Sequence, residues 1–450
     1  MRYQPHTDED VRSMLETMGL DRVDQLFSSI PEGLRLKAPL DLPEALDEQR
    51  LFEHVGKLAS MNRIEQMQAS FLGAGVYEHF VPAVVGQILA RGEFLTSYTP
   101  YQPEVSQGTL KAIFEFQTML SEILGMDLAN ASMYDGAHAT AEALLMGLRI
   151  RRKATKVLVS SALNPEYKEV SKTYLSHLEG AYVELPEKDG LTDLSQLDAS
   201  ALDGVAMVMV QCPNFYGSIE DLEAIKTFCT AHDLLFGVCF SEPLAYGLVK
   251  APGAVGADIA AGEAQSLGLA PGFGGPLLGV LACKIEHVRM TPGRLVSQGL
   301  DTEGRESYVL TLATREQHIR RARATSNICT NQGLMALACT IYLSLVGKQG
   351  FRELAELNLA RAEYAKAQLC AIPDVTLVYD APTFNEFVIR TPKPAAEVVR
   401  FAAARGVAAG LNLGRVDAAH HNDLLLAVTE INSREQIDLL VQLIGEMLLL

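Results

Sequence analysis

Between about residue 75 and residue 325, short apolar runs alternate with longer amphipathic stretches. In the amphipathic stretches, such as residues 109–124 and 139–150, apolar positions recur at helical spacing, which predicts helices. The apolar runs have the length of buried strands and are predicted as strands at residues 156–160, 181–185, 205–211, 235–240, 259–261 and 277–282. This order predicts a mostly parallel sheet with helices on both faces, whose ligands bind at the carboxyl ends of the strands.

The pattern differs at both ends of the chain. Residues 1–75 are predicted to form a helical N-terminal arm, which begins with a capping box at Thr7 and Asp10. Residues 76–328 would form the large domain, and residues 329–450 a smaller α/β domain with an antiparallel sheet. The elements predicted in the small domain are helices at residues 331–346, 350–370 and 394–404, strands at 375–379, 386–390 and 424–428, and a terminal helix from Ser433.

Composition and charge narrow the class of protein. The formal net charge is −17 and the pI is about 5.1, which argues against a nucleic-acid partner, because such partners need a basic face. No apolar run approaches the ~20 residues that cross a bilayer, and the N-terminus is polar, so we expect neither a membrane segment nor a leader. The 7 cysteines form no metal-binding pattern. We therefore expect reduced, buried thiols, no metal and a cytoplasmic location.

Residues 256–276 contain the most informative pattern. Gly-Ala-Asp, an apolar strand and a Gly-Gly-Pro loop form the frame in which one class of pyridoxal-phosphate (PLP) enzymes presents the lysine that binds the cofactor as a Schiff base. Here no lysine lies between Lys250 and Lys284, and Ser266 stands roughly at the expected position. Glu242 follows another predicted strand but departs from the register of the aspartate that pairs with the pyridine nitrogen in such enzymes. The missing lysine and the acidic residue out of register are two defects that favour a degenerate PLP site.

The start of the helix predicted after residue 135 could hold an anion, because small residues at a helix N-terminus leave backbone N–H groups accessible. In PLP enzymes of this architecture, the cofactor phosphate binds at this place. Asp135, however, puts a negative charge there and favours a structural cap over a phosphate site. His138 is interpreted as structural for the same reason.

Two polar segments are candidates for substrate contact. The loop at residues 97–108 carries two prolines and precedes a helix, and its candidate site residues are Tyr98, Tyr101, Gln102 and Glu104. Phenol, amide and carboxylate groups at this spacing could bind a small zwitterion; a proline-rich surface turn is the alternative. The segment at residues 325–333 clusters hydroxyl and amide groups, among them Ser326, Asn327 and Thr330. It could reach the cofactor of a partner chain, or simply cap the next helix.

These features together resemble the glycine-cleavage P-protein family, glycine dehydrogenase (decarboxylating), and within it the alpha chain of the two-chain form. The sequence Tyr-Thr-Pro-Tyr-Gln-Pro-Glu followed by Ser-Gln-Gly carries the strongest resemblance. The other matching stretches are residues 7–19, 26–27, 30–31, 71–77, 116–119, 125–132 and 324–332, which together span nearly the whole chain.

The resemblance implies an α/β fold of the PLP-dependent transferase (aminotransferase class I) type. It implies an oxidoreductase reaction in which glycine loses carbon dioxide and its aminomethyl group passes to the lipoyl arm of the carrier H-protein. PLP would be bound by a homologous beta subunit, in an α2β2 assembly, and not covalently by this chain, which would be inactive alone. Tyr98, Tyr101, Gln102 and Glu104 would be catalytic residues. Ser326, Asn327 and Thr330 would contact the cofactor across the interface.

Two other functions remain open from the sequence. The chain could be a non-catalytic scaffold or regulatory subunit of a PLP enzyme, which would have no need for the polar loop at residues 97–108. It could also be a self-sufficient PLP lyase with a displaced lysine, although Lys250 and Lys284 both lie more than a dozen residues from Ser266.

Overall fold

The computed structural model describes residues 5–62, 66–195, 197–198 and 200–450, in two units, Met1–Glu65 and Gln66–Leu450. The first unit contains the helices α1 (Asp8–Thr17) and α2 (Glu48–Ser60). The predicted capping box is confirmed, because the Thr7 hydroxyl accepts from the Asp10 N–H and the Asp10 carboxylate accepts from the Thr7 N–H. Residues between the two helices form short 3₁₀ turns and irregular chain, so the arm is less helical than the pattern predicts.

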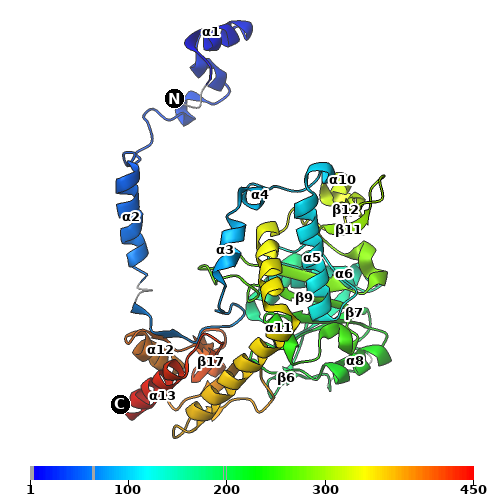
Figure 1. Cartoon of the computed structure of the whole chain (residues 1–450), viewed down its shortest axis with the longest axis vertical. Coiled ribbons are helices and arrows are strands. Elements are labelled where there is room, and N and C mark those ends of the chain that lie inside the picture. The colour runs from blue at the N-terminus through cyan, green and yellow to red at the C-terminus, as the bar shows by residue number, and fades with distance from the viewer. Residues whose placement is uncertain (1–4, 63–65, 196, 199) are drawn as a thin grey trace. The chain divides into compact units, whose positions relative to one another are not determined.

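The second unit is built around a seven-stranded sheet in the order β2-β10-β9-β8-β7-β3-β4 (Figure 1). Neighbouring strands from β4 to β9 are parallel, whereas β10 is antiparallel to both β9 and β2. The strands are β2 (Leu128–Ala129), β3 (Lys156–Ser160), β4 (Tyr182–Leu185), β7 (Val205–Gln211), β8 (Leu235–Phe240), β9 (Ile259–Glu263) and β10 (Gly279–Cys283). The predicted sheet and its strands are thereby confirmed.

Both faces of this sheet are buried, as the uninterrupted apolar strands require. Met207 and Met209 point to the face covered by α6 (Gly136–Ile150). Val208 and Val210 point to the opposite face, against α8 (Leu222–Ala231). On that same face, α5 (Gln107–Leu124) and the first half of α11 (Gly333–Cys370) cover β9 and β10.

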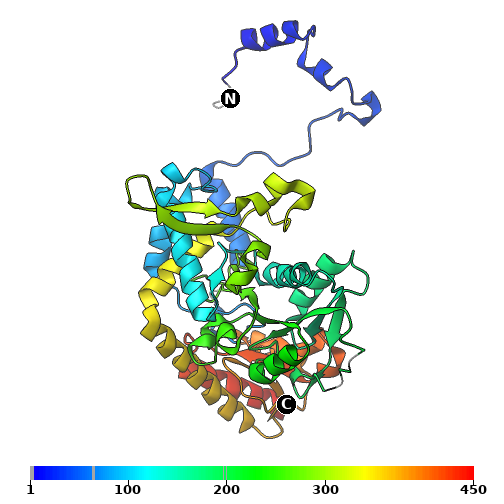
Figure 2. The same cartoon turned by 90° about the vertical axis from the view of Figure 1, so that its right-hand side faces the viewer.

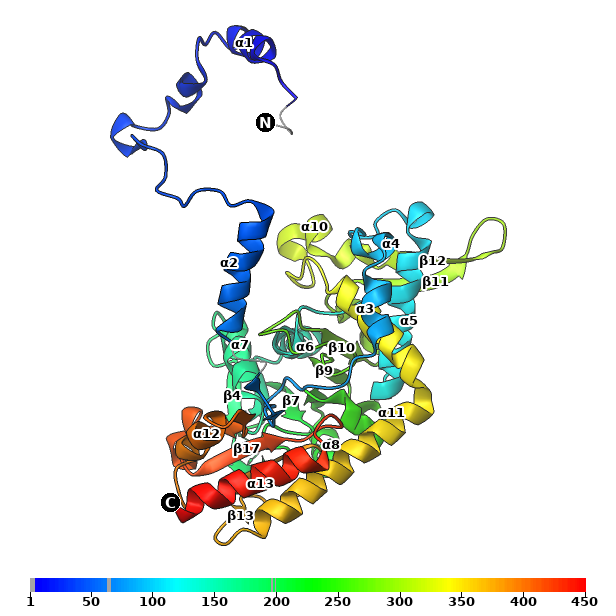
Figure 3. The ribbon, with the colours of Figure 1, turned by 60° about the vertical axis from the view of Figure 1, so that its left-hand side comes forward.

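A hairpin that the sequence pattern does not predict lies beside α5. It consists of β11 (Leu295–Leu300) and β12 (Glu306–Thr311), and its turn projects away from the sheet (Figure 3). Two glutamines of α5 hold it: the Gln107 amide pairs with the main chain of Tyr308, and the Gln117 amide pairs with the main chain of Val296. These contacts join positions about two hundred residues apart, which explains why local periodicity misses the hairpin.

The C-terminal part has the predicted antiparallel sheet, in the order β13-β14-β17-β16. Its strands are β13 (Thr376–Leu377), β14 (Glu386–Arg390), β16 (Leu411–Asn412) and β17 (Asp423–Ala427), and its helices are α12 (Ala395–Ala403) and α13 (Arg434–Leu449). The helices pack together beside the second half of α11 (Figure 2). A short strand β1 (Ala69–Ser70), which follows the N-terminal unit, pairs with β15 (Val407–Ala408).

Helix α11 corresponds to the two predicted helices at 331–346 and 350–370, joined across Gly347, whose φ of 62° is not helical. Among the described residues it is the one helix long and apolar enough to cross a membrane. Its apolar residues, however, pack into two hydrophobic clusters of the fold, around Tyr342 in the first half and Leu369 in the second. We therefore interpret α11 as a core helix that joins the two sheets.

Candidate functional site

Buried polar side chains fill the carboxyl ends of the central parallel strands. Gln211 ends β7, and its amide donates to the Ser241 hydroxyl, which follows β8, at 3.3 Å. Tyr77 reaches the same place and bonds Ser241 at 3.1 Å and the Glu386 carboxylate at 2.6 Å. Ser266, at the position expected for the lysine, donates to the Glu242 carboxylate at 2.8 Å. Hydrogen bonds between the chain's own side chains thus occupy the place where ligands of such sheets bind.

His79 provides a positive charge at the end of β8. Its imidazole lies 2.9 Å from the Glu242 carboxylate and 2.7 Å from the Glu430 carboxylate, and its side chain is almost completely buried. Burial lowers the pKa of His79, but the two carboxylates outweigh burial and raise it from 6.5 to about 10. Burial likewise opposes ionisation of Glu430, yet the His79 contact lowers the pKa of Glu430 to about 2. Glu242 is therefore paired with an imidazolium from the same chain.

The start of α6 is occupied by two acidic side chains. Asp135 caps the helix through the N–H of His138 and also contacts the His138 ring, which confirms the predicted structural cap. The Glu263 carboxylate accepts the Gly136 N–H at 2.9 Å and the Leu278 N–H at 2.7 Å. Burial raises the pKa of Glu263 to about 7, although these backbone hydrogen bonds act in the opposite direction.

The residues at this place do not fit PLP. A Cβ added at Gly136 would lie 2.9 Å from the Glu263 Cβ and closer still to the Tyr167 hydroxyl, so side chains of the protein pack tightly against the first residue of α6. The carboxylate of Glu263 already takes the backbone donor that a phosphate would use. Ser266 cannot form an imine, and Glu242 is held by His79 instead of facing a pyridine ring.

A separate cavity of about 200 Å³ lies between the loop at residues 97–100, the helix α5 and the start of α11. Tyr98 and Thr330, which come from the two candidate segments, both line it. Arg294, Asn331 and Thr109 add a guanidinium, an amide and a hydroxyl to the lining. The structure thus brings one member of each predicted group of site residues into the same cavity.

The other predicted loop residues lie outside this cavity. The Tyr101 hydroxyl accepts a hydrogen bond from Arg294 at 3.3 Å, and its ring lies 5.7 Å from that of His318. Gln102 and Glu104 are exposed in and before a short 3₁₀ turn. Tyr98 is 87% exposed. This exposure leaves the loop accessible to a partner or a ligand.

The residues of the segment 325–333 make different contacts. Ser326 donates to the Glu142 carboxylate of α6 at 2.7 Å, so its hydroxyl faces away from the cavity. Asn327 and Thr330 are exposed. Asn331 and Gln332 bind the Ser132 hydroxyl and thereby attach the segment to the large sheet.

Sequence reasoning missed two residues with central positions. Arg294 is 5% exposed and contacts both candidate segments, and His79 joins the ends of β8 and β17. The sequence could have pointed to Arg294, because it is a single basic residue directly before the buried apolar residues Leu295 and Val296. All seven cysteines are free, but Cys329 is exposed and Cys370 is half-buried, whereas the other five are buried as expected.

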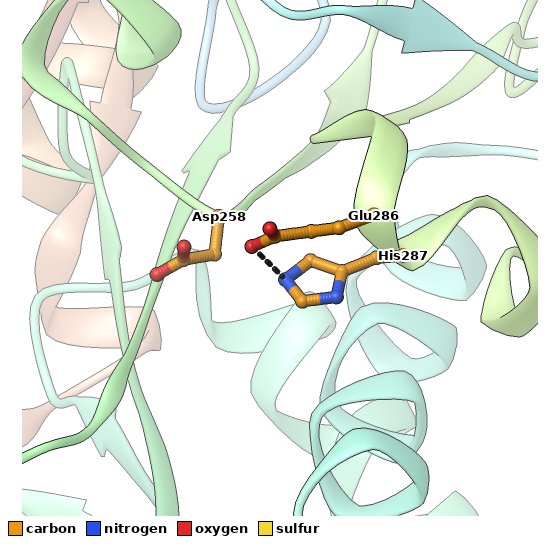
Figure 4. Close-up of side chains that lie close together, drawn as sticks. All are labelled: Asp258, Glu286 and His287. Carbon is orange, nitrogen blue, oxygen red and sulfur yellow. Dashed lines mark ion pairs between the residues drawn. The ribbon is translucent and has the colours of Figure 1, made fainter.

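One group of side chains has the spacing of metal ligands. Ligand atoms of Asp258, Glu286 and His287 lie within 4.8 Å of one another (Figure 4). Asp258, the one buried carboxylate of the three, already pairs with the ammonium groups of Lys284 and, at 3.8 Å, of Lys226. Two cations therefore neutralise this carboxylate, and we assign no metal to the group.

The fold agrees with known proteins. The structure of a sphingosine-1-phosphate lyase of Burkholderia pseudomallei matches with a TM-score of 0.65 and 16% identity over 93% of this chain and 94% of that one. At this identity the match shows a shared fold and nothing more. A crystal structure of glycine decarboxylase (P-protein) of the glycine cleavage system, in inhibitor-bound form, matches with a TM-score of 0.90 and 44% identity over 99% of this chain and 100% of that one. The predicted PLP-dependent transferase fold is confirmed.

The relatives in sequence cover the whole chain. Probable glycine dehydrogenase (decarboxylating) subunit 1 of Desulforamulus reducens is 49% identical, and that of Anoxybacillus flavithermus 47% identical, each over 99% of both chains. The family model of the glycine cleavage system P-protein matches residues 1–444. This chain therefore belongs to the glycine cleavage system P-protein family and is similar to its subunit 1 members along almost its entire length.

Proposed function

We propose that this chain is the alpha subunit of a two-chain P-protein, which decarboxylates glycine and transfers the aminomethyl group to lipoylated H-protein. A homologous beta subunit would hold PLP, in an α2β2 assembly in the cytoplasm. The proposal is supported mainly by one observation, that side chains of the chain itself fill the carboxyl ends of the strands. Glu263 occupies the start of α6, and His79 neutralises Glu242. A chain that belongs to this family but has no room for the cofactor needs a partner that has.

The contribution of this chain would come from the loop at residues 97–104. Tyr98 lines the polar cavity together with Thr330, and both side chains are exposed. In the assembly, the phenols of Tyr98 and Tyr101, with Gln102 and Glu104, would complete the glycine site of the beta subunit. Asn327 and Thr330 would approach the cofactor across the interface, and Ser326 would support them through its bond to Glu142. PLP on the partner would supply the electron withdrawal that allows carbon dioxide to leave.

The lyase with a displaced lysine has less support. Lys250 pairs with Glu223 on the surface, and Lys284 pairs with Asp258. Both ammonium groups are therefore engaged away from the strand ends where the cofactor would lie. The scaffold hypothesis differs from the proposal in one respect: it assigns no chemical role to the exposed loop tyrosines.

Reconstitution tests the proposal. We expect no glycine decarboxylation from the isolated chain with PLP and lipoylated H-protein, and activity after addition of the homologous beta subunit. Glycine–bicarbonate carbon exchange measures this reaction. Activity of the isolated chain would contradict the proposal.

Two variants separate the enzyme subunit from a scaffold. Tyr98→Phe and Glu104→Gln should each lower turnover of the assembled complex roughly tenfold, because each removes one polar contact to substrate. Assembly, followed by size-exclusion chromatography, should persist. Unchanged turnover in both variants would favour a scaffold.

A further inference from the structure

One buried arginine joins the two segments to which the proposed function assigns substrate and cofactor contacts. The Arg294 guanidinium donates from Nη1 to the Asn331 side-chain oxygen at 2.8 Å. Its Nη2 donates to the Cys329 carbonyl at 2.9 Å and to the Tyr101 hydroxyl at 3.3 Å. The guanidinium carbon also lies 5.6 Å from the centre of the Tyr101 ring.

The two segments differ in how firmly they are held. The segment that contains Asn331 is attached to the large sheet, because the Asn331 amide donates to the Ala131 carbonyl at 2.9 Å and to the Ser132 hydroxyl at 3.1 Å. In the described part of the chain, the one hydrogen bond to the Tyr101 hydroxyl comes from Arg294. Arg294 therefore links an exposed loop to a fixed segment.

An arginine suits this role for a geometric reason. Three acceptors in different directions match the planar fork of a guanidinium, whereas the single ammonium of lysine has no such fork. The three acceptors are neutral, and the Glu316 carboxylate, 3.9 Å from Nε, partly balances the charge. At 5% exposure the side chain has little contact with solvent.

We propose that Arg294 is a positioning residue that fixes the orientation of Tyr101 relative to the segment at residues 329–331, beside the cavity that Arg294, Thr330 and Asn331 line. The inference rests on the proposed function, because the orientation of Tyr101 matters to the reaction only if the loop contacts substrate. In this role Arg294 acts through its hydrogen bond to Tyr101 and not through a contact with substrate.

A double-mutant cycle in the assembled complex tests this role. Arg294→Lys and Tyr101→Phe should each lower kcat/KM for glycine roughly tenfold, the size expected for one hydrogen bond to a charged group. The double variant should lose no more than the more damaging single variant, since both remove the same link. Thermal unfolding of each chain reports folding separately, and Arg305→Lys, at an exposed position of the hairpin turn, is the matched control.

Each outcome decides between the two claims. Additive losses, or an Arg294→Lys variant with normal kcat/KM, would overturn the positioning role. Tyr98→Phe separates this failure from failure of the proposed function, because Tyr98 has no hydrogen bond to Arg294. If Tyr98→Phe lowers kcat/KM while Tyr101→Phe does not, the proposed function stands and the positioning role falls. If neither tyrosine variant changes kcat/KM, both the proposed function and the positioning role are contradicted.

Discussion

At the scale of single residues, His79 supplies a positive charge to a buried carboxylate. An unpaired carboxylate is costly in a buried site, and Glu242 lies 1% exposed at the end of β8. The imidazolium of His79 neutralises it and also holds Glu430, which follows β17. One protonated ring thereby fastens the central sheet to the C-terminal sheet.

The charge of His79 predicts a particular pH dependence of stability. Its pKa is raised from 6.5 in the unfolded chain to about 10 in the folded protein, so its contribution is complete below pH 6.5 and is lost as the pH rises towards 10. His79→Gln should therefore lower the free energy of unfolding by on the order of a few kcal/mol at pH 6.5, and by progressively less up to pH 10. Denaturant unfolding at several pH values measures this difference.

His177 provides the control for this experiment. It is exposed on the surface, and His177→Gln should leave the free energy of unfolding nearly unchanged at every pH. A His79→Gln deficit that stays constant between pH 6.5 and 10 would show that the ring contributes by packing and neutral hydrogen bonds, not by charge.

At the scale of elements, carboxylates of the chain itself accept the backbone N–H groups at the start of α6 that a bound anion would use. Asp135 caps the helix, Glu263 takes the Gly136 N–H, and Tyr167 packs against Gly136. The helix dipole is therefore satisfied by carboxylates of the chain itself. The close contacts of Tyr167 and Glu263 are the physical reason why position 136 requires a glycine.

Two glycine-to-alanine variants test these contacts. Gly136→Ala should lower the free energy of unfolding by about 1–3 kcal/mol, because the added methyl group would overlap Tyr167 and Glu263. Gly445→Ala in α13, where a Cβ meets nothing within 4 Å, should raise it by about 0.5–1 kcal/mol. Chemical denaturation of the isolated chain measures both. Equal, stabilising effects would mean that the start of α6 is open.

At the scale of the whole molecule, a PLP-dependent transferase fold is combined with protein side chains at the strand ends where the proposed function leaves no place for the cofactor. The carboxylate of Glu263 stands at the helix start where a phosphate would bind, and the imidazolium of His79 pairs with Glu242 where a pyridinium would. Ser266 completes the substitution by donating to Glu242. Under the proposed function, Ser266, Glu242, His79 and Glu263 together fill the place of the cofactor.

This arrangement predicts that restoring the lysine alone does not restore the cofactor. In Ser266→Lys, the new ammonium should pair with Glu242, and Glu263 should still block the helix start. With added PLP we expect neither visible absorbance nor pyridoxal fixed by borohydride at position 266. The homologous beta subunit, treated in parallel, serves as the positive control, and thermal unfolding confirms that the variant is folded. Pyridoxal fixed at position 266 would contradict the interpretation.

Periodicity was sufficient for most of the architecture. Buried parallel strands such as β7 have uninterrupted apolar sequences, and helices such as α5 have apolar residues that repeat every 3.6 positions. These patterns are visible in the sequence because the buried residues of one element are close together along the chain. The hairpin β11–β12 escaped detection, since its position depends on Gln107 and Gln117 of a distant helix. The domain boundaries at residues 75 and 328 remain predictions.

By itself, the sequence determined the fold class, the family and the absence of a lysine between Lys250 and Lys284, because each can be recognised from residues that are neighbours along the chain. Only the tertiary structure decided which side chains meet at the strand ends and which residues join the candidate segments. Tyr77 and Glu386 lie 309 positions apart yet meet at 2.6 Å, and Arg294 meets Tyr101 across 193 positions. Such pairs leave no periodic signal, since the free energy that holds them arises from burial and hydrogen bonds formed only after the sheets have packed.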